Sequence, residues 1–152
     1  MFKRILLSAL TVVFLSVFGL VLSGCGAFIP ALDPPDGIIE VSGTNGAWVE
    51  TQHGGAPWNT TTTVWVFVDN PTVSTVTAAV ESLASELVAS GRELGSTVSI
   101  RVVDGSPGQF SGDSFRTNRD FSDWNIVVDE LGIGSSGSNK GEFSASEFRS
   151  LS

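Results

Sequence analysis

The segment over residues 62–103 constrains the fold most, because it alternates strand-forming, helix-forming and strand-forming patterns. The first strand is expected over Thr62–Asp69, where valines alternate with Trp65 and Phe67. Both faces of this strand are therefore apolar, which is typical of a central strand covered on both sides. A second strand is expected over Thr97–Val103, with Val98, Ile100 and Val102 on one face and Ser99 and Arg101 on the other.

An amphipathic helix is predicted between these two strands. Its apolar stripe has spacings of three and four residues and consists of Val73, Val76, Val80, Leu83 and Leu87. Asp69 or Asn70 is expected to cap its start, with Pro71 in the first helical position, and Gly91 is expected to end it. Strand, helix and strand in this order form a β-α-β unit, which is right-handed in nearly all known cases.

Shorter patterns complete the expected domain. Residues 38–41 and 47–50 have the character of strands, and Asn45-Gly46 between them favours a hairpin. Another strand is predicted over 124–128, followed by a Gly/Ser-rich stretch over 132–141 and a short final element that packs back through Phe143, Phe148 and Leu151. The predicted fold is α+β, a two-layer sandwich in which a mixed sheet of about four to five strands packs on one long amphipathic helix.

The start of the chain has the composition of an export signal. Lys3 and Arg4 precede an uncharged, mostly apolar run over Ile5–Leu22, and Leu22-Ser23-Gly24-Cys25 follows. Eighteen helical residues would span roughly 27 Å, barely the thickness of a bilayer core. Length alone therefore leaves open a permanent transmembrane anchor, and plain secretion is a further alternative. The small residues before Cys25, the only cysteine, favour cleavage by a peptidase.

This start resembles the signal peptide and lipobox of bacterial lipoproteins, over about the first 25 residues. The resemblance implies that diacylglycerol is attached to Cys25 and that the chain is cut between Gly24 and Cys25. We therefore expect a signal peptide over 1–24, a lipidated cysteine and Pro-rich tether over 25–37, and one small domain over 38–152. The expected location is the extracytoplasmic side of a cell membrane or outer membrane, and Gly26 in place of Asp favours the outer membrane where there are two.

The charge of the chain excludes some partners. Eight basic and sixteen acidic residues give −8, and loss of Lys3 and Arg4 with the signal leaves six basic residues and a formal −10. An acidic domain is a poor binder of nucleic acid and of anionic headgroups through its body. The expected partners are the membrane, through the lipid anchor, and an envelope protein or cell-wall polymer.

Few residues point to catalysis. His53 is the only histidine, and the aspartates over residues 104–123 (Asp104, Asp113, Asp120 and Asp123) match no calcium-loop spacing. No catalytic residue, metal or cofactor is predicted. The alternative is a small envelope hydrolase or metal-assisted enzyme that uses His53 or the loop over 104–123.

The aromatic residues are the better signal for binding. Trp48, Trp65 and Trp124 are expected in the core, whereas Trp58, beside Pro57, is the best candidate for an exposed contact. Trp58 and His53 form the candidate binding surface, and Phe110, Phe115 and Phe121 are possible exposed aromatics on the second long loop. The expected function is that of a non-enzymatic binding or accessory module of the cell envelope.

Overall fold

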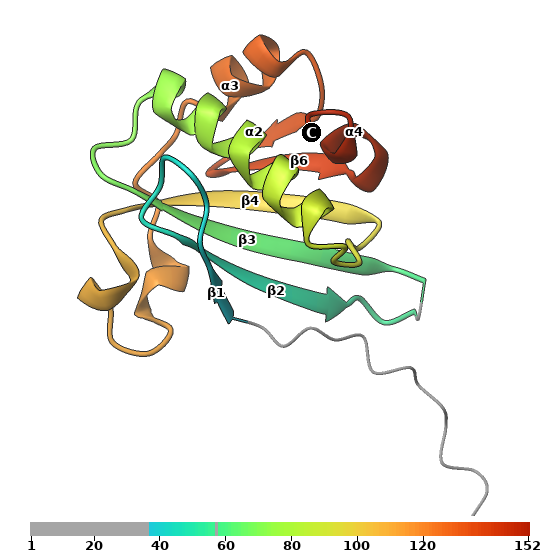
Figure 1. Ribbon diagram of the computed structural model, residues 1–152, viewed down its shortest axis with the longest axis horizontal. Helices are drawn as coiled ribbons and strands as arrows, with labels where there is room; N and C mark the ends of the chain where they lie inside the picture. Colours follow the sequence, from blue (N-terminus) through green and yellow to red (C-terminus); the bar gives the residue numbers. More distant parts are fainter. Residues whose placement is uncertain (1–36, 57) are drawn as a thin grey trace, which may run out of the picture. The chain divides into compact units, whose positions relative to one another are not determined.

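Six strands form one mixed sheet in the order β1-β2-β3-β4-β6-β5 in the computed structural model, which describes residues 37–56 and 58–152 (Figure 1). β3 and β4 are parallel, and every other neighbouring pair is antiparallel. The α+β class and the mixed sheet are confirmed, but the sheet is wider than predicted. The strands are β1 (Gly37–Ile39), β2 (Ala47–His53), β3 (Thr60–Val68), β4 (Thr97–Asp104), β5 (Ser135–Gly137) and β6 (Lys140–Ser144).

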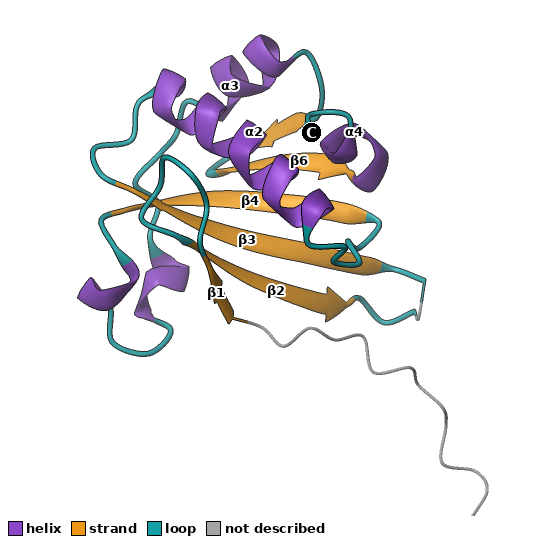
Figure 2. Ribbon diagram, viewed as in Figure 1, coloured by secondary structure: helices purple, strands orange, loops and turns teal. Residues whose placement is uncertain are grey.

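Three helices of the described residues cover one face of this sheet (Figure 2). They are α2 (Val73–Ala89), α3 (Trp124–Leu131) and α4 (Ala145–Arg149). The prediction of one long helix therefore holds for α2, and two short helices add to the same layer. The main core lies between these helices and the sheet, and all three helices contribute buried residues to it.

α2 buries the predicted stripe but begins later than predicted. Val76, Val80, Leu83 and Leu87 are at most 1% exposed, and Val73 packs at the margin of the core. The N-cap is Thr72, whose hydroxyl accepts a hydrogen bond from the Thr75 N–H at 3.3 Å. Asn70 cannot act as the cap because its φ is +50°, and its N–H instead donates to Asp104. Ser90 is the C-cap, and Gly91 follows it in the left-handed conformation that glycine favours.

β3 is central and covered on both faces, as predicted. Trp65 and Phe67 lie on the face opposite α2 and are 6% and 1% exposed. They form a second cluster with Val103 of β4 and with Phe115 from the long loop over 105–122. This loop contains two short 3-10 turns, η1 (Pro107–Gln109) and η2 (Ser114–Thr117).

The expectation that the loop phenylalanines are exposed is wrong. Phe115 packs on the rings of Trp65 and Phe67 at centroid distances of 5.7 and 5.5 Å. Phe121 reaches the main core and is only 5% exposed, and Phe110 is half-buried against the second cluster. The loop needs these rings to cover the apolar side chains that β3 presents on this face.

The prediction of a strand over 124–128 is also wrong, because these residues begin α3. The apolar positions Trp124, Val127, Val128 and Leu131 are spaced by three, one and three residues, which places them on one side of a helix. Gly132, with φ +70°, ends the helix and its N–H donates to the Val128 carbonyl. A helical stripe in so short a segment is easily taken for a strand when only its β-branched and aromatic residues are considered.

The strand ends and turns differ from the predictions in detail. The connection between β2 and β3 is short, over 54–59, because β2 continues past the predicted residue 50 to His53 and β3 starts at Thr60 rather than Thr62. β1 and β2 pair as predicted, but Asn45 does not adopt a positive φ. Its N–H donates to the Phe67 carbonyl and its side chain to the Gly105 carbonyl, so it joins the connection over 40–46 to the sheet.

The C-terminal part contains more regular structure than its composition indicates. The Gly/Ser-rich stretch over 132–141 includes β5 and the start of β6. The expected final element is confirmed, since Phe143 and Phe148 are at most 1% exposed and their ring centroids lie 6.0 Å apart. Leu151 packs against the same core.

α4 is stabilised by a capping box at its start. The Glu147 carboxylate accepts a hydrogen bond from the Ser144 N–H at 2.7 Å, and the Ser144 hydroxyl accepts one from the Glu147 N–H at 3.2 Å. The Ser144 N–H, followed by the Ser144 hydroxyl, lowers the pKa of Glu147 below its ordinary value. The ionised form is therefore favoured by folding.

This capping predicts a pH dependence of stability. The folded state lowers the pKa of Glu147, so the ionised carboxylate stabilises the fold. This stabilisation is present above the ordinary glutamate pKa of about 4.3 and is lost as the pH falls through the lower pKa of the folded state. Glu147→Gln replaces the carboxylate by an amide, whose oxygen still accepts a hydrogen bond but carries no charge. We expect the wild type to have the higher Tm at pH 7 and the difference to vanish in acid. A difference in Tm that is the same at pH 7 and pH 3 would contradict this role.

The predicted signal peptide, lipidation site and most of the tether lie outside the described residues. No helix of the described residues has the length and hydropathy needed to cross a bilayer.

Candidate binding surface

The sheet face opposite the helices gathers most of the basic side chains of the domain. Residues 37–152 contain six arginines and lysines, and four of them belong to this side of the sheet or to the loop that covers it. We call these four residues the cationic face; they are Arg101 on β4, Lys140 on β6, and Arg116 and Arg119 in the loop over 105–122. Strand alternation places Arg101 and Lys140 on this face, because their neighbours Ile100, Val102 and Gly141 face the helices.

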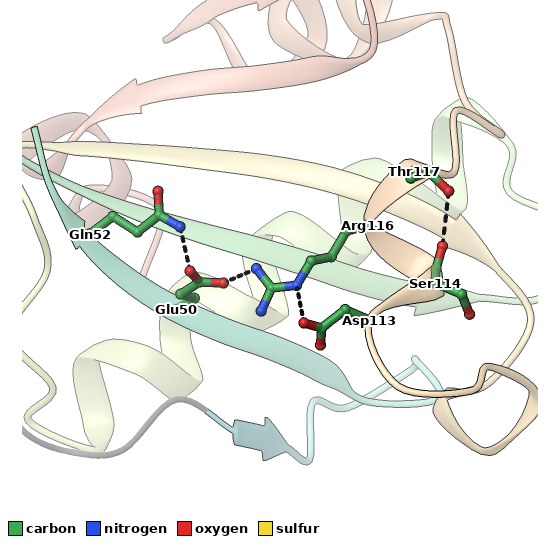
Figure 3. A network of polar contacts seen from close by, with 6 residues as sticks. All are labelled: Glu50, Gln52, Asp113, Ser114, Arg116 and Thr117. Atoms are coloured by element: carbon green, nitrogen blue, oxygen red, sulfur yellow. Dashed lines mark hydrogen bonds and ion pairs between the residues drawn. The ribbon is translucent and has the colours of Figure 1, made fainter.

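Arg116 lies at the centre of a polar network on this face (Figure 3). It forms an ion pair with Glu50 of β2 and a second one with Asp113, with the Arg116 Nε 3.4 Å from the Asp113 carboxylate. Glu50 also accepts a hydrogen bond from Gln52. The Arg116 guanidinium lies 4.9 Å from the centre of the Trp65 ring, within the range of a cation–π contact.

The electrostatics of Arg116 are those of a well-paired cation. Burial acts to lower its pKa, but the hydrogen bond and charge of Glu50, and then Asp113, raise the pKa of Arg116 above its ordinary value. Glu50 is only 9% exposed, so this pair also satisfies a largely buried carboxylate. Arg116 therefore fastens the long loop to β2, and its charge is already compensated within the protein.

Arg101 has the opposite environment. It lies directly beside Trp65 across the parallel β3–β4 pair and is half-buried. Within the described residues, its guanidinium has neither a hydrogen bond nor an ion pair. Burial lowers the pKa of Arg101, the positive charge of Arg119 lowers it further, and Glu142 only partly offsets these effects. Arg101 is thus a partly desolvated cation that lacks a direct partner.

The two other members of the cationic face, Lys140 and Arg119, also differ in whether they form an ion pair. The Lys140 ammonium is 2.7 Å from the Glu142 carboxylate and is therefore paired. Arg119 uses one guanidinium nitrogen to donate to the Arg116 and Asn118 carbonyls, at 3.1 and 2.7 Å. No carboxylate of the described residues forms an ion pair with Arg119. Arg101 and Arg119 are consequently two neighbouring positive groups, neither of which forms an ion pair among the described residues.

The predicted contact residues lie elsewhere. Trp58 is 80% exposed in the connection over 54–59, as predicted, and His53 is exposed at the end of β2. Neither residue belongs to the cationic face. Their roles in binding remain predictions.

The structure does not bring His53 together with the aspartates of residues 104–123. His53 is opposite Thr60 at the start of β3, whereas Asp104 is opposite Val68 at its end. Eight residue steps along β3 separate these positions by about 26 Å. A catalytic pair of His53 and Asp104 would need contact over a few ångströms, so the geometry does not favour it.

Three of these aspartates serve as local structural acceptors. Asp104 accepts a hydrogen bond from the Asn70 N–H at 2.8 Å, and Asp120 accepts one from the Asp104 N–H at 3.1 Å. Asp113 pairs with Arg116. Over residues 37–56 and 58–152, no group of three or more metal-ligating side chains is close enough to hold a metal ion.

Two hollows occur on the described surface. One of about 790 Å³ is lined by residues 38–46 and Glu86, and another of about 420 Å³ lies between β6 and α4 and includes Glu142 and Glu147. Neither is lined by His53, Trp58 or an arginine.

Reasoning from the sequence missed the cationic face. Arg101 stands out only as a charged residue within a central, otherwise largely apolar strand, and Arg116 and Arg119 only as basic residues within a loop that holds as many acidic ones. These signals become informative once the loop is known to fold over β3. No protein-family model, curated protein or solved structure matches this chain.

Proposed function

We propose that the chain is an extracytoplasmic lipoprotein, anchored in a membrane through Cys25, whose domain is a non-enzymatic module that binds an anionic component of the cell envelope through Arg101 and Arg119. The observation that carries the binding role is the half-buried, unpaired guanidinium of Arg101 beside a second positive charge. The anchor rests on the pattern Leu22-Ser23-Gly24-Cys25 after an uncharged apolar run.

Arg101 and Arg119 supply a chemical basis for recognising an anion. A guanidinium can give two parallel hydrogen bonds to a carboxylate or a phosphate, and such charge-assisted bonds are among the stronger polar contacts. A bound anion would also relieve the repulsion between these two cations. In a mature chain of formal charge −10, two unpaired cations on one face favour a specific contact over general attraction to anions.

The neighbouring residues support a built surface. Trp65, next to Arg101, is packed by Phe115 and by the fixed guanidinium of Arg116. The strand that carries Arg101 lies between β3 and β6, so its backbone is held on both sides. Such support limits the conformational entropy that Arg101 would lose on binding. The partner is an envelope protein with an acidic segment or a wall polymer with carboxylates or phosphates.

Binding of polyanions by the lipidated protein in detergent tests this proposal. With a polyglutamate peptide and a polyphosphate chain as probes, Arg101→Ala should weaken binding about tenfold or more, since hydrogen bonds to charged groups contribute roughly 1.5–3 kcal/mol. Arg149→Ala, which removes an exposed arginine from α4, is the matched control and should have little effect. The affinity of the wild type should also fall as salt is raised.

The two probes separate the two partner chemistries. Preference for polyglutamate favours an acidic protein segment, and preference for polyphosphate favours a phosphate-bearing polymer. Equal binding by Arg101→Ala, Arg149→Ala and the wild type would refute the role of Arg101.

A further inference from the structure

We propose that Trp58 and its described neighbours in the connection between β2 and β3, residues 54–56 and 59, contact the headgroup region of the membrane that holds the protein. This inference rests on the proposed lipid anchor at Cys25 and adds an orientation to it. The lipid surface is the one occupant that fits the exposure, position and charge of this connection together.

Trp58 is the most exposed of the large hydrophobic side chains that the structure describes. Its exposed fraction is 80%, against 57% for Ile38, 43% for Ile126 and 39% for Val88. The connection that carries it is closed by hydrogen bonds from the Gly54 N–H to the Asn59 carbonyl at 2.7 Å and from the Asn59 N–H to the Ala56 carbonyl at 2.9 Å. The connection therefore presents an indole to solvent, and covering so large an apolar ring would be favourable.

This connection lies at the end of the sheet from which the chain enters. Gly37 is opposite Val49 and Ile39 is opposite Ala47, so β1 runs into the sheet from the side toward which β2 leaves (Figure 1). β2 continues four residues beyond Val49 to His53, about 14 Å at the rise of an antiparallel strand. We call this side, with the connections over 54–59 and 90–96, the entry end.

The tether is long enough to permit the contact. Cys25 precedes Gly37 by twelve residues in the sequence. A chain of that length reaches at most about 40 Å when fully extended. This limit is larger than the roughly 14 Å from the level of Gly37 to His53, so the surface chemistry of the domain, rather than the tether length, decides which side faces the lipid.

Charge distinguishes the entry end from the opposite end. The connections over 54–59 and 90–96 contain one acidic residue and one basic residue, a net charge of 0. At the opposite end, the connections over 40–46 and 69–72 and the last residue of β4, Asp104, contain three acidic residues and no basic one, a net charge of −3. No acidic residue occurs between Glu50 and Asp69.

The orientation of the domain follows from the charge of its two ends and from the exposure of Trp58. An anionic membrane surface repels the opposite end of the domain and not the entry end. Tryptophan favours the membrane–water interface, where its apolar ring is covered and its N–H keeps a polar partner. The acidic character of the whole chain argues against binding of the body of the domain to lipid, but an anionic surface does not repel the entry end, whose net charge is 0.

Aqueous quenching of a site-specific dye tests this contact in the full lipidated chain. His53→Cys places a label beside Trp58, and Ser42→Cys places one at the opposite end; both residues are exposed. Because lipid occupies Cys25, each variant has a single free thiol. In vesicles of phosphatidylethanolamine and phosphatidylglycerol, iodide should quench the label at 53 at least about twofold less than the same label in protein without vesicles, owing to burial at the interface. Quenching at 42 should not change.

The matched variant is Trp58→Ala, which should restore quenching at position 53 and leave the fold intact, because exposed substitutions rarely change stability by more than about 0.5 kcal/mol. Equal quenching at 53 and 42 in vesicle-bound protein would overturn the contact while leaving the anchor standing. Failure of the protein to float with vesicles would refute both. Protection of position 53 in isolated envelopes but not in pure lipid would assign Trp58 to a protein or wall polymer and overturn the proposal.

Discussion

Cys25→Ser is expected to abolish fatty-acid labelling of the protein and to leave its signal peptide uncut. A serine hydroxyl lacks the nucleophilic thiolate on which transfer of the diacylglycerol group depends. Each buried methylene contributes about 0.8 kcal/mol, so two acyl chains make an attachment that is effectively permanent, and the variant loses all of it. Intact mass and incorporation of labelled palmitate measure both changes directly.

Ser23→Ala is the control for this experiment, because it keeps a small residue before the cleavage site and leaves Cys25 in place. This control should be processed and acylated as the wild type is. A Cys25→Ser protein that is still cut between positions 24 and 25 and still carries fatty acid would refute the lipoprotein assignment. A wild-type mass equal to that of the untreated translation product would refute it as well.

Trp124→Ala is expected to cost about 3–5 kcal/mol of unfolding free energy, the range for large aromatic residues removed from a core. Trp124 is fully buried, and its ring packs edge-on against Phe121 at 5.6 Å. A Cβ at Gly141 would lie 2.6 Å from the Trp124 ring, so the facing strand leaves no room between them. The indole N–H has no hydrogen-bond partner among the described residues, which favours the lower part of this range.

Urea unfolding of the full chain in detergent measures this difference through the midpoint and slope of the transition. Trp58→Ala provides the control, since it removes the same side chain from an 80% exposed position and should change stability by less than about 0.5 kcal/mol. Equal losses for the two variants would contradict the packing described around Trp124.

Local patterns predicted the centre of the fold well. The stripe of α2 and the alternation in β3 and β4 are long and strongly periodic, so they identify both the element and the buried face. The segment over 124–131 was misread because it offers only two turns of periodicity. The N-cap was placed too early because Asn70 and Pro71 match a capping pattern, whereas the left-handed backbone of Asn70 passes that role to Thr72.

The cationic face could not be predicted because it depends on contacts distant in sequence. Glu50 and Arg116 are 66 residues apart, and Arg101 becomes a neighbour of Arg119 only when the long loop folds over β3. The phenylalanines of that loop, predicted as exposed, are what hold it there. By contrast, the exposure of Trp58 was predictable, because Gly54-Gly55 and the neighbouring proline mark a turn within the sequence itself.

The short outer strands have a consequence for crowding. β1 and β5 form the two edges of the sheet, and each is only three residues long. Long unpaired edges invite strand exchange and fibril growth between copies. Molecules confined to a two-dimensional layer would meet one another far more often than molecules in free solution, and β1 and β5 themselves offer few backbone groups for such pairing. Edge strands this short would therefore limit strand exchange between crowded copies.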